Sequence, residues 1–199
     1  MLDALKGRAV PVEQNANAAD RDAELVARAR RDRQAFGALY DRYLDAIYHY
    51  CFVRLGNREA AEDATSLVFT KAIDGLPGYR GGSFRSWLFA IAHNVVVDAH
   101  RAARPMEALT AAAGVTDPSP APEELALDQD NGRAIRALLE GLSPEQREVV
   151  ELRLAGLTGP EIARVLGKSH AAVRIAQFRG YTRLRALVSG AVKESDGDA

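Results

Sequence analysis

Residues 158–173 read TGPEIARVLGKSHAAV, and this stretch decides the fold of the C-terminal part of the chain. Thr158, Pro160 and Glu161 form a helix-start signal, because a hydroxyl cap, an early proline and a carboxylate three residues after the cap all favour a helical N-terminus. Gly167 then ends a short helix, and a new helical pattern begins three residues later. Two helices joined by so short a turn are typical of a helix-turn-helix.

The helix predicted over residues 170–188 has two different faces. Small and apolar residues share one face and can pack on the preceding helix: Val173, Ala176, Gly180, Leu184 and Leu187. The opposite face carries Arg174, Ile175, Phe178 and Arg179, a mixture of cations and apolar groups suited to the major groove of DNA. We therefore predict DNA binding; the alternative is a helical bundle whose basic face is merely solvated.

The net charge of −1 hides a segmented pattern. Residues 21–104 carry a net +3 and residues 131–193 a net +6, whereas residues 105–130 between them carry −6. Residues 162–188 hold six basic side chains and no acidic one, which provides the clustered cations that phosphate binding needs. The acidic segment contains three closely spaced prolines and is expected to be an extended, self-repelling linker.

Helical periodicity also dominates the N-terminal part, and alternation of period two is nowhere sustained. Helices are predicted over residues 23–33, 34–55, 58–74 and 84–103. The fold class is therefore all-α, with two small helical domains joined by an extended acidic linker. The expected boundaries are residues 1–20 for a flexible tail, 21–104 for the first domain, 105–130 for the linker, 131–189 for the second domain and 190–199 for a flexible acidic tail.

One irregular segment interrupts the helices of the first domain. Residues 78–87 read GYRGGSFRSW and combine glycines with two arginines and three aromatic residues. Unstacked bases can lie on aromatic faces while arginine neutralises phosphate, so this composition suits single-stranded DNA. We expect Tyr79, Arg80 and Ser83 to make such contacts, whereas a core position is the preferred interpretation for Trp87 and Ile91.

Three motifs occur in order along the chain: AEDATSLVF at residues 61–69, SFRSWLFAIAHN at 83–94, and LSPEQR at 142–147 ahead of the helix-turn-helix. Over residues 22–188 the chain resembles the sigma-70 superfamily, and within it the extracytoplasmic-function (ECF, group 4) sigma factors, which carry only sigma regions 2 and 4. The resemblance implies a non-catalytic role: binding core RNA polymerase, directing it to promoters and helping to open the duplex.

The resemblance also implies site residues. Those expected on the clamp coiled coil of the polymerase beta-prime subunit are Glu62, Asp63, Ser66, Leu67 and Phe69. Those expected on the minus-10 element, which is read as single strands, are Tyr79, Arg80, Ser83, Phe84, Trp87, Asn94, Asp98 and Arg101. Those expected on the double-stranded minus-35 element are Thr158, Lys168, Ser169, His170, Arg174, Ile175, Phe178, Arg179 and Arg183.

Several of these positions depart from the family pattern or have alternatives. Ser66 and Leu67 stand where the family usually has Gln and an acid, which predicts a more apolar polymerase interface; alternatively, Leu67 and Phe69 only pack inside. Asn94 could cap backbone groups instead of reading a base. Residues 175–177 replace a common Ser-Arg-Leu pattern, so the minus-35 sequence cannot be inherited from relatives.

The polymerase beta subunit is a further partner that the resemblance implies, and an anti-sigma factor is one that it allows. The linker resembles a segment that threads the polymerase active-site cleft.

No cofactor, metal site or enzymatic activity is expected, because the four histidines form no ligand set and no Gly-x-Ser-x-Gly or phosphate-cradling motif occurs. With a single Cys51 and no apolar run of membrane-spanning length, a cytoplasmic protein without membrane insertion is expected. A stand-alone helix-turn-helix regulator and a helical protein that sequesters a partner remain as alternatives.

Overall fold

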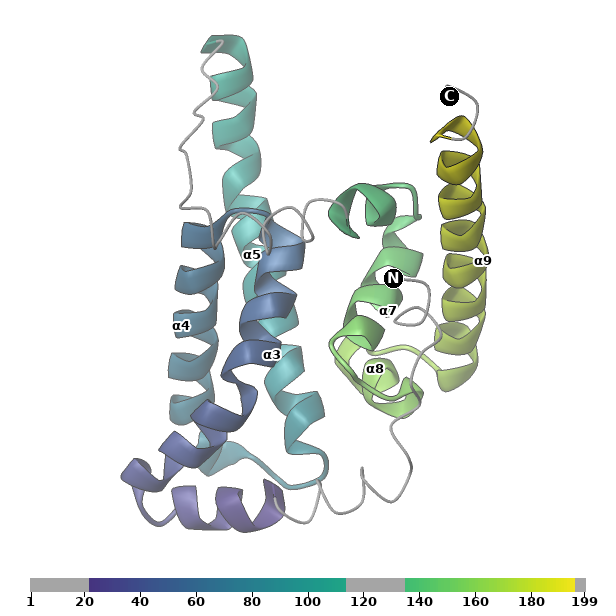
Figure 1. Cartoon of the computed structure of the whole chain (residues 1–199). Coiled ribbons are helices and arrows are strands. Elements are labelled where there is room, and N and C mark those ends of the chain that lie inside the picture. Colours follow the sequence, from purple (N-terminus) through teal and green to yellow (C-terminus); the bar gives the residue numbers. More distant parts are fainter. Residues whose placement is uncertain (1–21, 114–134, 196–199) are drawn as a thin grey trace.

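The computed structural model describes residues 22–113 and 135–195, and no β-strand occurs among these residues. They form an N-terminal module (residues 22–113) and a C-terminal module (residues 135–195), as Figure 1 shows. The elements of the first are a helix at 22–29, η1 (Arg33–Phe36), α3 (Gly37–Leu55), α4 (Arg58–Gly75), η2 (Leu76–Gly78) and α5 (Phe84–Ala113). Those of the second are a helix at 135–140, α7 (Pro144–Leu154), α8 (Gly159–Leu166) and α9 (His170–Ser195).

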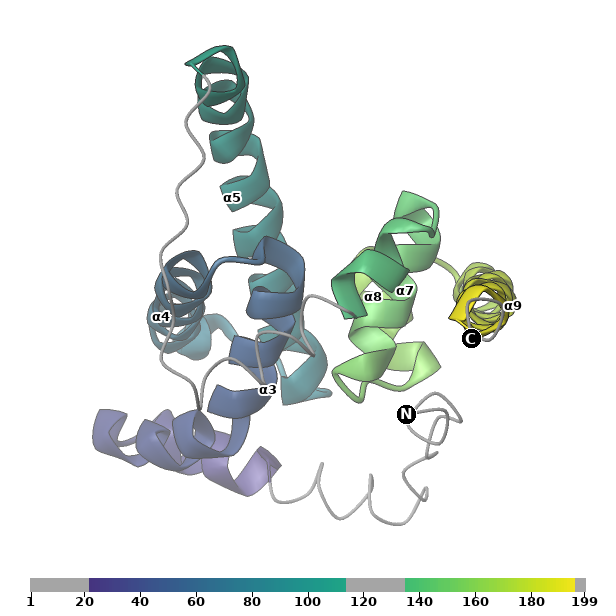
Figure 2. The ribbon, with the colours of Figure 1, turned by 45° about the horizontal axis from the view of Figure 1, so that its top comes forward.

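Helices α3, α4 and α5 pack side by side, and the helix at 22–29 crosses one end of this bundle (Figures 1 and 2). Gly56 ends α3 in the left-handed conformation (φ 70°), and the Asn57 side chain caps α4 by accepting the Ala60 N–H at 3.0 Å. The largest fully buried side chains of this bundle are Leu39, Ile47, Val68, Phe84, Leu88, Phe89 and Val96.

The predicted helix-turn-helix is confirmed. Ser143 and Gln146 form a capping box that opens α7, and the Glu161 carboxylate accepts the Thr158 N–H at 2.8 Å at the start of α8. Gly167 adopts φ 63° and ends α8, so α9 begins after a short turn. Local capping chemistry therefore sets the geometry of the helix-turn-helix.

Two helices continue beyond their expected ends. α5 runs through Pro105 to Ala113, although the linker was expected from residue 105, and α9 runs to Ser195 into the expected tail. Residues 106–113 are mostly strong helix formers, which favours continuation although Pro105 removes one backbone N–H donor. The remainder of the predicted linker, the N-terminal tail and the last four residues lie outside the described residues.

The two modules share one hydrophobic core, which the sequence did not predict. Val149, Leu152, Leu157, Ile162 and Val173 belong to the same buried cluster as the residues of the N-terminal bundle. The contact is made where α8 packs on α5 and α7 on α3 (Figures 1 and 2). The C-terminal module is therefore docked on the N-terminal one rather than separated from it.

Candidate nucleic-acid interface

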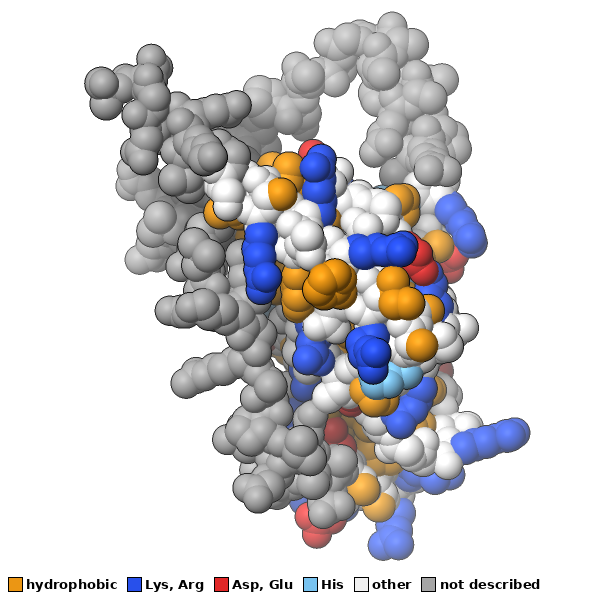
Figure 3. All heavy atoms as spheres, turned by 90° about the vertical axis from the view of Figure 1, so that its right-hand side faces the viewer, with side chains coloured by type: hydrophobic (Ala, Val, Ile, Leu, Met, Phe, Trp, Pro, Cys, Tyr) orange, Lys and Arg blue, Asp and Glu red, His pale blue; other side chains and the backbone are white. Residues whose placement is uncertain are grey.

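The outward face of α9 is basic and apolar at once. Val173 and Ala176 are buried, as predicted, whereas Ile175 is 53% exposed and Phe178 73% exposed. Figure 3 shows apolar side chains in the middle of this face, with Lys and Arg side chains around them. An exposed aromatic side chain with cations around it suits contact with the bases and phosphates of a DNA groove.

The other residues predicted to contact the minus-35 element are held by local contacts. The Ser169 hydroxyl accepts the Ala172 N–H at 3.1 Å, and the Thr158 hydroxyl donates to Glu161 at 2.8 Å. Lys168 Nζ lies 2.6 Å from Oε1 of Glu145. These side chains fix the ends of α8 and α9, so they position α9.

His170 and Arg183 lie at the borders of the same face, and both are exposed. The His170 ring packs over Gly159, because a Cβ at residue 159 would lie 2.7 Å from its Nε2 atom. Arg183 Nε donates a long hydrogen bond to the Gly141 carbonyl at 3.4 Å. The side chains of His170 and Arg183 are therefore accessible at the edge of this face.

Tyr79 and Phe84, predicted to contact single-stranded DNA, lie in the core instead. Tyr79 is 8% exposed and Phe84 1% exposed, and their ring centroids are 5.8 Å apart. The Tyr79 hydroxyl donates to the Gly82 carbonyl at 2.7 Å, which folds the loop back over the two rings. Because burying such rings is strongly favourable, they pack beneath the loop and do not form the surface that a DNA strand could contact.

A pocket of about 520 Å³ opens beside this loop. Arg80, Ser83, Ser86 and Trp87 line it together with Arg164 from α8. Arg80 is exposed, whereas Ser83 is half-buried and donates its hydroxyl to Glu161 at 2.8 Å. Sequence reasoning did not single out Ser86, although it lies within the 78–87 segment. It missed Arg164 because only the packing of α8 on α5 brings this residue to the loop.

A second pocket of about 350 Å³ shares Trp87 with the first and is lined by Lys71, Gly75 and Asn94. Asn94 is exposed, and it lines this pocket together with Trp87. Lys71, which sequence reasoning also missed, adds a cation from α4. An aromatic wall, an amide and an ammonium group are the chemistry that an unstacked base and its phosphate require.

Asp98 and Arg101 lie further along α5, and both are exposed. They form an ion pair three residues apart, with Arg101 Nη1 at 3.7 Å from Asp98 Oδ1. An exposed pair of this kind is weak, so the Arg101 guanidinium can exchange Asp98 for a phosphate.

The predicted polymerase-docking residues divide between surface and core. Glu62, Asp63, Ser66 and Leu67 are exposed on one face of α4, and Leu67 is 45% exposed, so the inward alternative for Leu67 is wrong. Phe69 is buried, with its ring centroid 4.6 Å from that of Tyr40. It therefore packs inside the bundle, as the alternative interpretation had it, and does not face polymerase.

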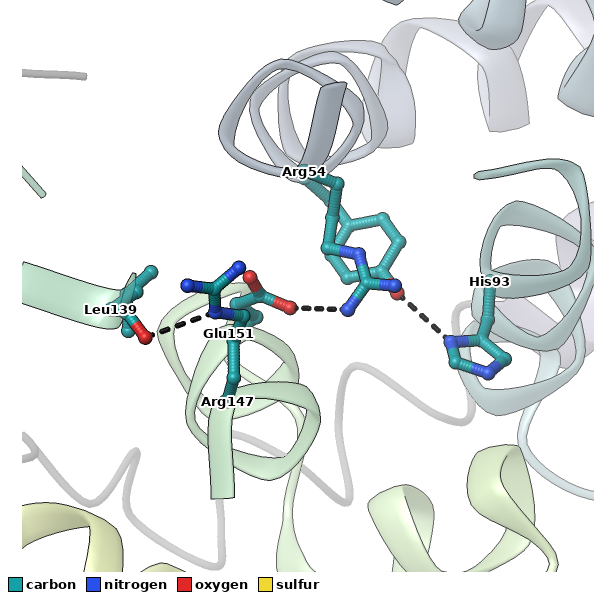
Figure 4. Close-up of polar contacts among 6 residues, drawn as sticks. Arg54, His93, Leu139, Arg147 and Glu151 are labelled. Carbon is teal, nitrogen blue, oxygen red and sulfur yellow. Dashed lines mark hydrogen bonds and ion pairs between the residues drawn. The ribbon is translucent and has the colours of Figure 1, made fainter. Parts of the chain in front are cut away.

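Polar contacts also cross between the two modules. Arg54 Nη1 lies 2.7 Å from Glu151 Oε2 (Figure 4), and burial raises the pKa of Glu151 although Arg54 opposes that shift. On the bundle side, the Tyr50 hydroxyl lies 3.2 Å from His93 Nδ1, and burial lowers the pKa of this histidine. The module contact thus contains charge as well as apolar surface.

Comparison with known proteins explains both modules. Residues 39–105 match the family model described as Sigma-70 region 2, and residues 132–184 match Sigma-70, region 4. The chain is 37% identical over 181 residues to the ECF RNA polymerase sigma factor BldN of Streptomyces coelicolor, covering 86% of this chain and 69% of the relative. This chain is an ECF RNA polymerase sigma factor.

Other relatives agree with that membership. The sigma factor is 34% identical over 180 residues to the ECF RNA polymerase sigma factor SigD of Mycobacterium tuberculosis, covering 82% of each chain. Its fold matches the solved structure of CnrH in complex with the cytosolic domain of CnrY, with a TM-score of 0.65 and 25% identity, covering 88% of this chain and 97% of that one.

The predicted resemblance is thereby confirmed, and the protein is a sigma factor for promoter-specific transcription initiation. Region 2 falls on the bundle of α3, α4 and α5, and region 4 falls on the module that contains the helix-turn-helix. Within residues 22–113 and 135–195, no helix combines the length and hydropathy needed to cross a membrane.

Proposed function

We propose that this sigma factor reads a promoter through two sites of different chemistry, one on each module. The observation that carries the proposal is the pairing of an exposed basic and apolar face on α9 with pockets built around Trp87 on α5. The first suits a closed duplex, which offers groove edges and phosphates. The second suits an opened strand, which offers unstacked bases.

On the minus-35 element, α9 lies in the major groove. Arg174 and Arg179 donate hydrogen bonds to guanine edges or phosphates, while Ile175 and Phe178 contact thymine methyl groups. Arg183 contributes a phosphate contact, which positions the helix without adding sequence information. Departures from the family pattern at residues 175–177 give this protein a minus-35 preference of its own.

On the minus-10 element, Trp87 stacks against an unstacked base and Asn94 hydrogen-bonds its edge. Lys71, Arg80 and Arg101 neutralise the phosphates of the same strand. Both pockets border Trp87, so neighbouring nucleotides can occupy them in turn. Binding the separated strand more tightly than the duplex is what makes the protein promote DNA opening.

Polymerase binding falls to the exposed face of α4. Glu62 and Asp63 provide negative charge, and Leu67 provides an apolar contact for the clamp coiled coil of the beta-prime subunit. The beta subunit receives the C-terminal module. Bond formation belongs to the core enzyme, so the sigma factor acts without catalysis of its own, in the cytoplasm where that enzyme works.

An anti-sigma factor is a further partner that we propose for this chain. The matched solved structure holds CnrH together with the cytosolic domain of CnrY. An inhibitor of this kind would compete with polymerase for the same sigma factor, and its removal would release the protein for initiation.

The proposal is tested by transcription with purified core polymerase on a library of linear promoter fragments. We expect transcripts that depend on the sigma factor and start downstream of two shared sequence elements. Arg174→Ala and Arg179→Ala should change the upstream element that is selected, whereas Asp41→Ala, on the exposed surface of α3, should not. If no template gives a factor-dependent transcript while another ECF factor is active with the same core enzyme, the proposal is wrong.

A further inference from the structure

We propose that the pocket between the loop at residues 78–83 and α8 is a binding site for a free nucleoside 5′-phosphate. The base of this ligand lies against Trp87, and its phosphate is held by Arg80 and Arg164. The inference goes beyond the proposed function, because Arg164 belongs to the module that is assigned there to minus-35 DNA. The ligand is a small molecule and not a part of the promoter.

The pocket lies at the contact between the two modules. Its volume of about 520 Å³ falls within the range of roughly 300 to 1,000 Å³ that is typical of small-molecule sites. The loop and the first two turns of α5 line one part of it, and Arg164 of α8 lines another. It therefore has room for one small ligand that contacts both modules.

Trp87 provides an aromatic wall that is held in place by its neighbours. Its ring centroid lies 5.2 Å from that of Tyr79 and 5.4 Å from that of Phe84. The Trp87 side chain is half-buried by this packing and also lines the pocket. Stacking on an aromatic ring is favourable for every base, so the wall suits a nucleobase without selecting one.

Two guanidinium groups provide the phosphate-binding part of the pocket. Arg80 is exposed in the loop, and Arg164 is exposed on α8. Arg164 Nη1 donates a long hydrogen bond of 3.4 Å to the Ser86 hydroxyl, and a guanidinium has further N–H groups to offer to a ligand. Because planar guanidinium groups can donate two parallel hydrogen bonds to a phosphate, the pocket favours an anionic ligand.

The Glu161 carboxylate lies close to the pocket, but its oxygens already accept hydrogen bonds. Oε1 accepts the Ser83 hydroxyl at 2.8 Å, and Oε2 accepts the N–H and the hydroxyl of Thr158, each at 2.8 Å. Burial acts to raise the pKa of Glu161, but these hydrogen bonds outweigh burial and hold the pKa below its usual range. None of the described residues that line the pocket is acidic, so the two arginines set its local charge.

A nucleotide bound in this pocket joins the two modules. Arg80 belongs to the N-terminal module and Arg164 to the C-terminal one, and the docked arrangement brings both to the same pocket. A ligand that binds the folded arrangement stabilises it by mass action. Binding therefore links the concentration of a free nucleotide to the stability of the module contact.

The site is tested by titrating the full-length protein with adenosine 5′-monophosphate (AMP), without DNA or polymerase. Trp87 is the single tryptophan, so its fluorescence reports on the pocket directly. We expect saturable quenching, because the base stacks on the indole ring. Calorimetric titration should show that adenosine and inorganic phosphate, each with one half of the ligand, bind at least about tenfold more weakly. No saturable quenching, or equally tight binding of inorganic phosphate, overturns the proposal.

Variants identify the cations that hold the phosphate. Arg80→Ala and Arg164→Ala should each weaken AMP binding at least about tenfold, since each removes hydrogen bonds between charged groups. Arg28→Ala, at an exposed arginine of the helix at 22–29, is the matched control and should bind AMP like wild type. Circular dichroism establishes that each variant is folded. Wild-type affinity in Arg164→Ala, or an equal loss in Arg28→Ala, overturns the proposal.

Thermal unfolding tests whether the ligand joins the modules. Saturating AMP should raise the melting temperature of the wild-type protein and of Arg28→Ala. It should raise that of Arg164→Ala much less, because the phosphate then lacks its contact with α8. An equal rise in all three proteins contradicts the link between the modules.

A single-stranded oligonucleotide offers the same base and phosphate groups, so it is the second source of this chemistry. The proposed function gives the strand cations from α4, α5 and the loop, and none from α8. Arg164→Ala should therefore weaken AMP binding while it leaves binding of the minus-10 strand unchanged. Equal losses for AMP and for the strand would assign the pocket to DNA and overturn this inference. If AMP binds as expected but the protein starts no transcription with core polymerase, it is the proposed function that fails.

Discussion

Arg54 Nη1 and Glu151 Oε2 lie 2.7 Å apart although 97 positions separate them in the chain, and their side chains are only 10% and 3% exposed. Removing one partner leaves the other as an uncompensated buried charge. We expect Glu151→Leu to lower the free energy of unfolding by about 3 kcal/mol, and Arg54→Met/Glu151→Leu to recover most of that loss. Urea denaturation followed by the fluorescence of Trp87, the single tryptophan, measures both. Equal losses in the single and double variants would contradict this assignment.

The exposed ring of Phe178 should matter for DNA and not for folding. Phe178→Ala should change the free energy of unfolding by less than about 0.5 kcal/mol. It should weaken binding of the polymerase–sigma complex to minus-35 duplex DNA by about 1 kcal/mol, roughly a fivefold loss of affinity. Val173→Ala on the buried face of the same helix is the matched control, and it should lose about 2 kcal/mol of stability.

Substitutions at the loop residues Tyr79 and Arg80 should have different effects, on stability at Tyr79 and on strand opening at Arg80. Arg80 is exposed, so Arg80→Ala should slow strand opening, measured by permanganate reactivity of unpaired thymines, with an unchanged melting temperature. Tyr79→Phe removes the hydrogen bond to the Gly82 carbonyl and should lower stability by about 1 kcal/mol. A large loss of stability in Arg80→Ala would show that its side chain supports the fold instead.

The α4 surface gives a prediction for polymerase assembly. Leu67→Lys adds a positive charge where the apolar contact is proposed, and it should weaken binding to core polymerase at least about tenfold, since burying an unpaired charge is costly. Fluorescence anisotropy of labelled protein measures this affinity. Thr70→Lys, one turn along the same exposed face, is the control for a general effect of added charge. Equal losses in the two variants would place the apolar contact elsewhere.

Burial raises the pKa of the Cys51 thiol from near 9 to about 11, although a hydrogen bond with Thr65 opposes this. The folded protein should therefore react negligibly with a disulfide reagent at about pH 8, and unfolded protein should react completely. The unfolded thiol ionises first, so stability present below about pH 9 should fall as pH rises towards 11, by at most about 1.4 kcal/mol per pH unit.

In Cys51→Ala, the free energy of unfolding should no longer fall between about pH 9 and pH 10. The tyrosines do not yet contribute to the pH dependence in this range. Urea denaturation at several pH values provides the comparison. The same slope in the variant would assign the pH dependence to other groups.

Features set by neighbouring residues could be predicted from the sequence. The helix-turn-helix depends on caps such as Thr158 with Glu161 and on the left-handed turn at Gly167, all within a few positions of one another. Side-chain periodicity likewise gave the buried and exposed faces of α9 correctly, from Val173 to Phe178. These signals are local, so they survive without knowledge of the tertiary fold.

Features set by distant contacts could not be predicted. Tyr79 was expected to face DNA but is buried, because burial depends on which helices cover a residue. The pocket cation Lys71 comes from α4 and has no local signal. Ser83 meets Glu161 78 positions away, a pairing that only the docking of the two modules creates.

The continuation of α5 past Pro105 has a mechanical consequence. At 1.5 Å per residue, this 30-residue helix is about 45 Å long, and its far end projects beyond the bundle (Figure 1). The C-terminal end of α5 therefore sets where the chain leaves the N-terminal module. The 21 residues from 114 to 134 can reach about 70 Å at full stretch. Shortening α5 by whole turns would move this exit point towards the bundle. We expect it to change the distances between the minus-10 and minus-35 elements that one molecule can span.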